Sequence, residues 1–199
     1  MNTPLTIPLF PLNLFRLPGE VLQLHVYEPR YKELIEDVLN GTIDYFGIPA
    51  VFEYPDPMLG VLVSLETILE KHEDGTYDIE VKIVDLFELL NYQNQQKSKL
   101  YPCGDIKRLH FEPTLVKSPT IRRKILELSD KYNHLFRIHT SNATDIDILA
   151  ELELEDDDKL DYILTPTQEE RDQFLMYQLR KLELFLMQHK ASSGNFNLN

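Results

Sequence analysis

The sequence predicts an α+β protein in which a β-rich half is followed by a helical half. Up to Pro113, apolar residues mostly alternate with polar ones, which is the period of a half-buried strand. After Pro113 they recur every three or four residues, as they do on one face of a helix. The chain has 199 residues, of which 43% are hydrophobic and 27% charged. It can therefore bury a sizeable core, in one domain or in two small packed lobes.

The first half is predicted to form short strands around one helix. Residues 5–9 form an apolar run interrupted by prolines, which fits an edge strand, and residues 21–26 alternate as a second strand. From Glu28 the apolar spacing becomes helical and ends at Asn40-Gly41. Further strands are expected over 44–52, 58–70, 76–90 and 105–111, with a hairpin turn at 73–75.

The second half is predicted to be a helical bundle. Helices are expected over 119–139 and 146–152, from 157 or 158 to 164, and from Thr167 onward, where Glu170 completes a capping box. The lobes are expected to span residues 1–116 and 117–190, with a frayed polar tail at 191–199.

The charge of the chain argues against nucleic-acid binding. The net charge is -13, and the densest basic group, residues 122–124, lies within a helical pattern. Phosphate backbones would be repelled. The N-terminus lacks the features of a signal peptide, and no run of about 18 apolar residues occurs. We expect a cytoplasmic protein that binds neither nucleic acid nor membrane.

Residue types that carry catalysis or bind metals are not arranged in recognisable motifs. The seven glycines are scattered and none precedes a lysine, so no P-loop is present. Cys103 is the only cysteine, and its setting predicts an unreactive thiol in a turn between strands. No two histidines have the i, i+4 spacing of a helical metal site, and the acidic run 151–158 is expected to be a solvated turn. We predict no catalytic residue, no cofactor and no metal site.

Several motifs resemble one known family. Residues 7–12 read IPLFPL, residues 17–19 read LPG, and residues 22–31 read LQLHVYEPRY. This series is similar to the opening signature of the Lon N-terminal substrate-binding domain: P-L-F-P-L, then F-P-G, then L-x-L-x-I-F-E-x-R-Y. Later segments extend the resemblance over residues 5 to 188: 46–48, 59–61, 74–79, 149–154, 159–164 and 170–171.

The resemblance implies a PUA-like β pseudo-barrel with an embedded helix, followed by a C-terminal helical bundle. It also implies a non-catalytic LON-domain protein without the ATPase and Ser-Lys peptidase of full-length Lon. Such a protein would bind unfolded or tagged polypeptide, or a separate ATPase or protease, through exposed apolar surface. The alternative is a scaffold or adaptor without client binding; RNA binding through the barrel is disfavoured by the charge.

One segment departs from the family pattern. The family usually continues its hairpin with V-x-G-x-x-R-x-x-I, whereas residues 81–89 contain neither that glycine nor that arginine. The local bulge or ion pair that these residues serve is therefore in doubt.

Two segments supply candidate binding residues. The loop at 12–17 carries Leu12, Leu14, Phe15 and Leu17, with Phe15 as the preferred anchor; alternatively, these side chains cover the bottom of the barrel as part of the core. Tyr27, Arg30 and Tyr31 form the densest motif, in which Arg30 could receive a carboxylate. The alternative is a helix entry, with Glu28 in the first turn and Pro29 at the first helical position.

Overall fold

The computed structural model describes residues 4–50, 58–95, 98–132, 138, 142–152 and 154–194, with side chains up to 188. The chain divides into two compact units, Met1–Phe111 and Glu112–Asn199. The first contains six strands and one helix among the described residues, and the second contains four helices. The predicted α+β order, with a β-rich part preceding a helical part, is confirmed.

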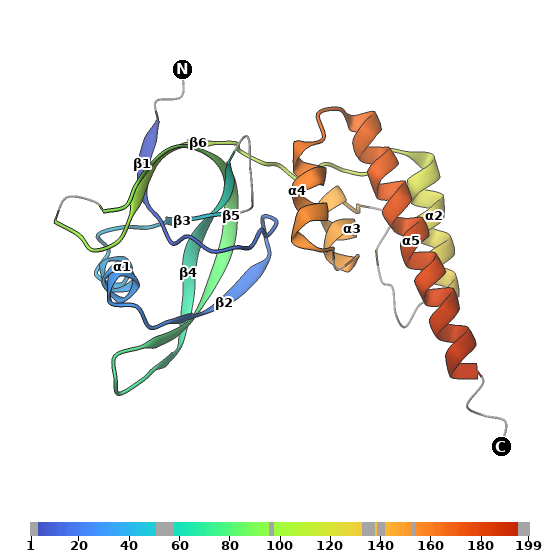
Figure 1. Cartoon of the computed structure of the whole chain (residues 1–199). Helices are drawn as coiled ribbons and strands as arrows, with labels where there is room; N and C mark the ends of the chain where they lie inside the picture. Colours follow the sequence, from blue (N-terminus) through green and yellow to red (C-terminus); the bar gives the residue numbers. More distant parts are fainter. Residues whose placement is uncertain are drawn as a thin grey trace. The chain divides into compact units, whose positions relative to one another are not determined.

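The strands of the first unit form an antiparallel sheet that curls into a pseudo-barrel (Figure 1). The strand order is β1-β6-β5-β4-β3, and β2 pairs separately with β5. Beyond β1, Leu9 and Leu12 form parallel bridges with Gly47 and Ala50, and the amide of Phe10 donates to the carbonyl of Gly47 at 2.7 Å. These contacts join the two ends of the sheet. The bounds are β1 (Leu5–Pro8), β2 (Val21–Val26), α1 (Pro29–Leu39), β3 (Phe46–Pro49), β4 (Leu59–Lys71), β5 (Tyr77–Gln93) and β6 (Cys103–Arg108).

Strand β5 is the longest strand, and it pairs with three others. It lies against β4 along most of its length, against β2 in its first part and against β6 in its last part. Its alternating apolar side chains face the core: Tyr77, Ile79, Val81 and Ile83 are each at most 2% exposed. The period-two pattern therefore identified the buried face of this strand correctly.

Strand β5 contains a bulge where it lacks the family's glycine, and the carboxylate beside the bulge makes an ion pair. The pairing shifts from Leu62 opposite Asp85 to Val63 opposite Ile83, so that Val84 is the extra residue. The buried Asp85 carboxylate accepts from Arg108 Nε at 3.0 Å and from the Phe111 amide at 3.0 Å. A cation from β6 therefore balances the charge of this buried carboxylate.

Close packing explains one glycine of the barrel. A Cβ at Gly104 would lie 2.7 Å from the carbonyl oxygen of Asn91 on the neighbouring strand, too close for any larger residue. The core beside it contains Ile7, Leu9, Leu62, Phe87 and Ile106.

Several predicted boundaries are wrong; for example, the helix expected from 157 or 158 begins at Asp156, with Glu155 as its N-cap. Cys103 begins β6 and is buried instead of lying in a turn, and burial raises the pKa of its thiol. Strand β6 ends at Arg108 instead of 111, and His110 then takes a positive φ of 49° that ends the extended backbone. Helix α2 (Pro119–Lys131) ends before Tyr132 instead of reaching 139; residues 133–137 and 139–141 lie outside the described part.

The second unit consists of α2, α3 (Asp145–Glu151), α4 (Asp156–Leu164) and α5 (Gln168–Gly194). Helix α5 continues to Gly194, so the predicted tail is helical at 191–194, and residues 195–199 lie outside the described part. The predicted capping box at Thr167 and Glu170 is confirmed by reciprocal hydrogen bonds. None of the described helices is long and apolar enough to cross a membrane.

Within this unit one buried carboxylate links three segments. Asp145 accepts from the Tyr162 hydroxyl at 2.7 Å and from the Thr114 amide at 2.8 Å. Burial, followed by the nearby Asp145 charge, raises the pKa of Tyr162, so the phenol stays protonated and donates. The hydrogen bonds therefore hold α3, α4 and the chain before α2 together.

Candidate functional site

Two of the predicted contact residues belong to the core. Phe15 and Leu17 are both 0% exposed, so the preferred role of Phe15 as an exposed anchor is wrong and the alternative of core packing is the one observed. The loop turns these side chains inward because its backbone is held: the Glu20 carboxylate accepts from the Leu17 amide, and Arg16 Nη1 donates to the Phe15 carbonyl at 3.0 Å. Neither residue can contact a client without unfolding the loop.

The other five predicted residues come together. They line a hollow of about 330 Å³ in the first unit, between the loop after β1, strand β2 and the start of α1. Leu12 and Leu14 are half-buried there, and Tyr27 is 62% exposed. The lining comprises Phe10, Pro11, Leu12, Leu14, Leu22, Gln23, Leu24, His25, Tyr27, Glu28, Arg30 and Tyr31.

Stacked rings form a firm base for this hollow. Phe10 stacks on Tyr31 with ring centroids 4.0 Å apart, and both residues are only 5% exposed. Burial raises the pKa of Tyr31, so the ring remains a neutral and largely apolar surface. Tyr31 therefore packs in the core and also lines the hollow.

Arg30 is engaged inside its own motif. Its Nε and Nη2 atoms each lie 2.8 Å from Glu28 Oε2, and its guanidinium carbon lies 4.5 Å from the centre of the Tyr31 ring. Pro29 is the first residue of α1, as predicted for a helix entry, but Glu28 is the N-cap residue instead of lying in the first turn. The motif is thus a helix start that borders the hollow, with the Arg30 charge already balanced by Glu28.

Strand β2 supplies the opposite wall, and it has an open edge. Leu22 to His25 line the hollow consecutively, although successive side chains of a strand point to opposite faces, so the hollow reaches the backbone of the strand. Among the residues described here, β2 pairs with β5 and with no other strand. Its outer edge therefore offers backbone donors and acceptors beside the apolar hollow.

The ladder shows which residues present those groups. The Ile83 amide donates to the Glu20 carbonyl at 3.0 Å, and Val21 lies opposite Lys82. Since hydrogen-bonded and non-bonded pairs alternate in an antiparallel ladder, the amides and carbonyls of Val21, Gln23 and His25 point to the outer edge.

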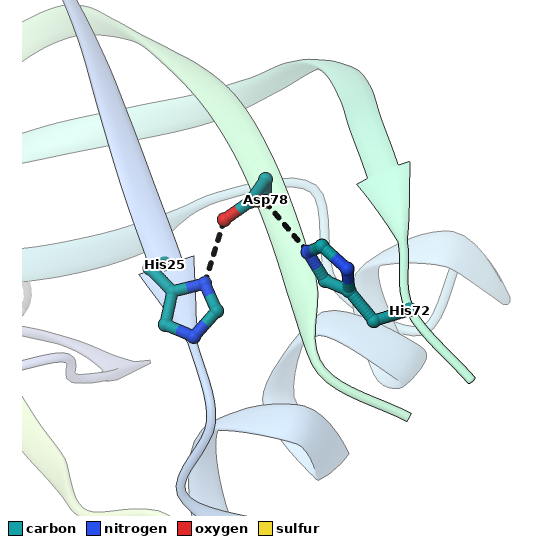
Figure 2. Close-up of side chains that lie close together, drawn as sticks. All are labelled: His25, His72 and Asp78. Atoms are coloured by element: carbon teal, nitrogen blue, oxygen red, sulfur yellow. Dashed lines mark hydrogen bonds and ion pairs between the residues drawn. The ribbon is translucent and has the colours of Figure 1, made fainter. Parts of the chain in front are cut away.

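Sequence reasoning missed Leu22 and Leu24 as lining residues, because their alternation indicated a strand without showing which edge of it would be paired. It also missed that His25 and His72 meet at Asp78 (Figure 2). His72 and Asp78 flank the β4–β5 hairpin turn, but His25 is far from both in the sequence, and only the register of β2 on β5 brings it to Asp78.

Comparison with known proteins identifies the family to which this fold belongs. A family model described as the ATP-dependent protease La (LON) substrate-binding domain matches residues 6–179. The chain belongs to the LON substrate-binding domain family. The suspected resemblance is confirmed, and membership supports a polypeptide-binding module. The match covers the substrate-binding domain alone, which is compatible with a chain that is not an enzyme.

Solved structures show the same fold. The crystal structure of a Lon N-terminal domain protein from Xanthomonas campestris is 18% identical, with a TM-score of 0.61 over 92% of this chain and 98% of that one. The N-terminal domain of a Mycobacterium avium complex Lon protease is 14% identical, with a TM-score of 0.60 over 88% and 98%. No curated protein sequence matches the chain. This chain therefore shares the fold of Lon N-terminal domains, a pseudo-barrel followed by helices, although its sequence identity to them is low.

Proposed function

We propose that this LON-family chain is a non-catalytic module that binds unfolded or tagged polypeptide in an extended conformation along β2. The observation that carries the proposal is an apolar hollow beside an unpaired strand edge. Unfolded clients share little besides a free backbone and exposed apolar side chains. A strand edge can bind the free backbone, and a hollow can accept the apolar side chains. Peptides that bind by β-strand addition use these two kinds of contact.

The size of the hollow indicates weak binding. At about 330 Å³ it lies near the lower end of ligand pockets, so it accommodates one or two apolar side chains of a client. Leu12, Leu14, Leu22 and Leu24 surround this space, and the stacked Tyr31 supports it from below. The hollow should therefore bind clients of different sequences, because it makes few directional contacts with them.

The charge of the chain restricts the clients. A net charge of -13 repels acidic segments, and Glu28 balances the nearest cation, Arg30. Neutral or basic apolar segments are therefore preferred. We propose that bound clients pass to a separate ATPase or protease.

The test is fluorescence anisotropy of a labelled unfolded polypeptide titrated with the whole chain. Tyr27→Ala should weaken binding severalfold, because Tyr27 is 62% exposed and lines the hollow. Tyr177→Ala is the matched control, since Tyr177 is 65% exposed on α5. Absence of saturable binding by the wild-type chain, or equal effects of the two variants, would refute this site.

A second peptide tests the strand edge without altering the protein. A client methylated at alternate backbone nitrogens keeps its side chains but cannot donate along one edge. It should bind at least tenfold more weakly than the unmethylated peptide. Equal affinity would mean that side-chain contacts alone hold the client.

A second candidate function is docking of a folded partner on the helical unit. Leu184 and Phe185 of α5 are each 61% exposed, and a hollow of about 730 Å³ between α3, α4 and α5 is lined by Leu152, Leu154 and Leu182. An exposed apolar surface of this kind favours the scaffold alternative. In that case Leu184→Ser would abolish partner capture while leaving polypeptide binding unchanged.

A further inference from the structure

Two imidazoles and one carboxylate, from β2, β5 and the start of the β4–β5 hairpin turn, lie close together (Figure 2). His25 Nδ1 lies 2.6 Å from Asp78 Oδ1, and His72 Nε2 lies 2.7 Å from Asp78 Oδ2. One possible ligand atom from each residue lies within 4.8 Å of the other two. The cluster is open to solvent, with the side chain of His25 55% exposed.

Backbone pairing positions each of the three side chains. His25 on β2 lies directly opposite Asp78 on β5, in a non-hydrogen-bonded pair, where side chains approach most closely. His72 follows β4, and its amide donates to the Thr76 carbonyl at 2.9 Å across the hairpin turn. Two of the three side chains therefore lie on paired strands, and the third is held at the start of the β4–β5 hairpin turn.

We propose that His25, His72 and Asp78 bind a divalent transition-metal ion of the zinc class. Two imidazole nitrogens and one carboxylate oxygen are ligands that Zn²⁺ takes in three-residue sites, and the exposed side leaves a fourth position for water. Tetrahedral bonds of about 2.0–2.1 Å separate ligand atoms by about 3.3 Å. The nitrogen–oxygen pairs at 2.6 and 2.7 Å must therefore open by about 0.6–0.7 Å, for which the exposed His25 ring and the half-buried His72 ring have room to move.

The surroundings of the cluster favour a cation. Glu70 Oε1 lies 3.4 Å from His72 Nδ1, the ring nitrogen that faces away from Asp78, as in a carboxylate–histidine–metal arrangement. This contact orients the ring and directs Nε2 toward the ion. Asp74, in the same hairpin turn, adds further negative charge.

The experiment is a Zn²⁺ competition titration of the whole chain against a chromophoric chelator. One ion per chain with micromolar or tighter affinity is expected. His25→Ala and His72→Ala should each weaken it at least tenfold. The matched control is His110→Asn: His110 is also an exposed histidine beside a carboxylate, 3.7 Å from Asp85, and asparagine tolerates its positive φ. It should leave the affinity unchanged.

A spectroscopic measurement separates coordination from folding effects. Co²⁺ in place of Zn²⁺ should give visible absorption bands of tetrahedral type in the wild type and in His110→Asn, but not in His72→Ala or Asp78→Asn. Circular dichroism verifies that all variants fold. Millimolar Zn²⁺ affinity in the wild type, or affinity that survives in His25→Ala and His72→Ala, would overturn the proposal.

Discussion

At the scale of single residues, Asp37 shows how a carboxylate holds the embedded helix against the barrel. It lies on α1, accepts from the Tyr101 hydroxyl at 2.7 Å and pairs with Lys99 Nζ at 2.5 Å. Burial alone would raise the pKa of Asp37, but the hydrogen bonds from Lys99 and Tyr101 and the Lys99 charge outweigh it and lower the pKa below 3.8. The ionised form therefore stabilises the folded state.

Asp37→Asn should lower the free energy of unfolding by about 1–3 kcal/mol near neutral pH, because the variant loses the charge-assisted hydrogen bonds. Since the folded pKa lies below the unfolded value, the wild-type advantage is present above pH 3.8 and is lost as the pH falls through the folded pKa. Urea unfolding at several pH values measures this. A difference between the two proteins that stays constant down to about pH 2 would contradict the assignment.

Phe15 provides the second prediction at this scale. Because its ring is fully buried, Phe15→Ala should lower the free energy of unfolding by about 3–5 kcal/mol, chiefly through the cavity left behind. Leu14→Ala, at a half-buried neighbour, should cost much less and should act on polypeptide binding instead. Chemical denaturation together with anisotropy compares the two variants. A stable Phe15→Ala protein that no longer binds polypeptide would restore Phe15 as a contact residue.

At the scale of elements, β2 differs from its neighbours because it lies off the path that closes the sheet. The two end strands of that path, β1 and β3, are joined through the bridges at Leu9 and Leu12, whereas β2 is paired along one edge among the described residues. Protein sheets usually protect a long edge, since an exposed one invites pairing with other chains. The exposed positions Val21, Gln23 and His25 carry no proline or lysine that would discourage such pairing.

Gln23→Pro tests this edge. It removes one outward amide but none of the bonds to β5, so polypeptide affinity should fall at least tenfold while the protein stays folded. Leu24→Pro is the contrasting variant, because its amide points to β5 and its loss should lower the melting temperature. Anisotropy and thermal unfolding measure both effects. Unchanged affinity in a folded Gln23→Pro protein would exclude the strand edge from binding.

At the scale of the whole molecule, the acidic charge separates the two kinds of extended polymer that a pseudo-barrel could bind. A chain of net charge -13 should bind apolar polypeptide with little dependence on salt, because the contacts are largely uncharged. Raising the salt from about 0.1 M to about 1 M shortens the screening length from about 10 Å to about 3 Å and should change the polypeptide affinity less than threefold. RNA should not be retained even at low salt. Salt-sensitive retention of RNA would support the disfavoured alternative.

The local pattern of residues was sufficient for most of the elements and for the family. Period-two alternation located β2 and β5, Pro29 and the Thr167–Glu170 box marked two helix starts, and the motif at 22–31 indicated the LON domain. These features depend on neighbouring residues, whose spacing is visible in the chain itself. Boundaries such as the end of α2 were wrong because apolar periodicity continues past Tyr132 although the helix does not.

The site depended on contacts between residues that are distant in the sequence. The loop at 12–17 has apolar residues that favour either core or surface, and only its packing against the barrel buries Phe15 and Leu17 while leaving Leu12 and Leu14 at the hollow. The meeting of His25, His72 and Asp78 likewise requires the register of β2 on β5, which long-range pairing sets. The strands, the helices and the family could be predicted from the sequence, because they depend on the spacing of residues that are close together in the chain. The open edge of β2, the hollow and the cluster of His25, His72 and Asp78 were decided by the tertiary structure, because side-chain burial and strand pairing are properties of the assembled sheet.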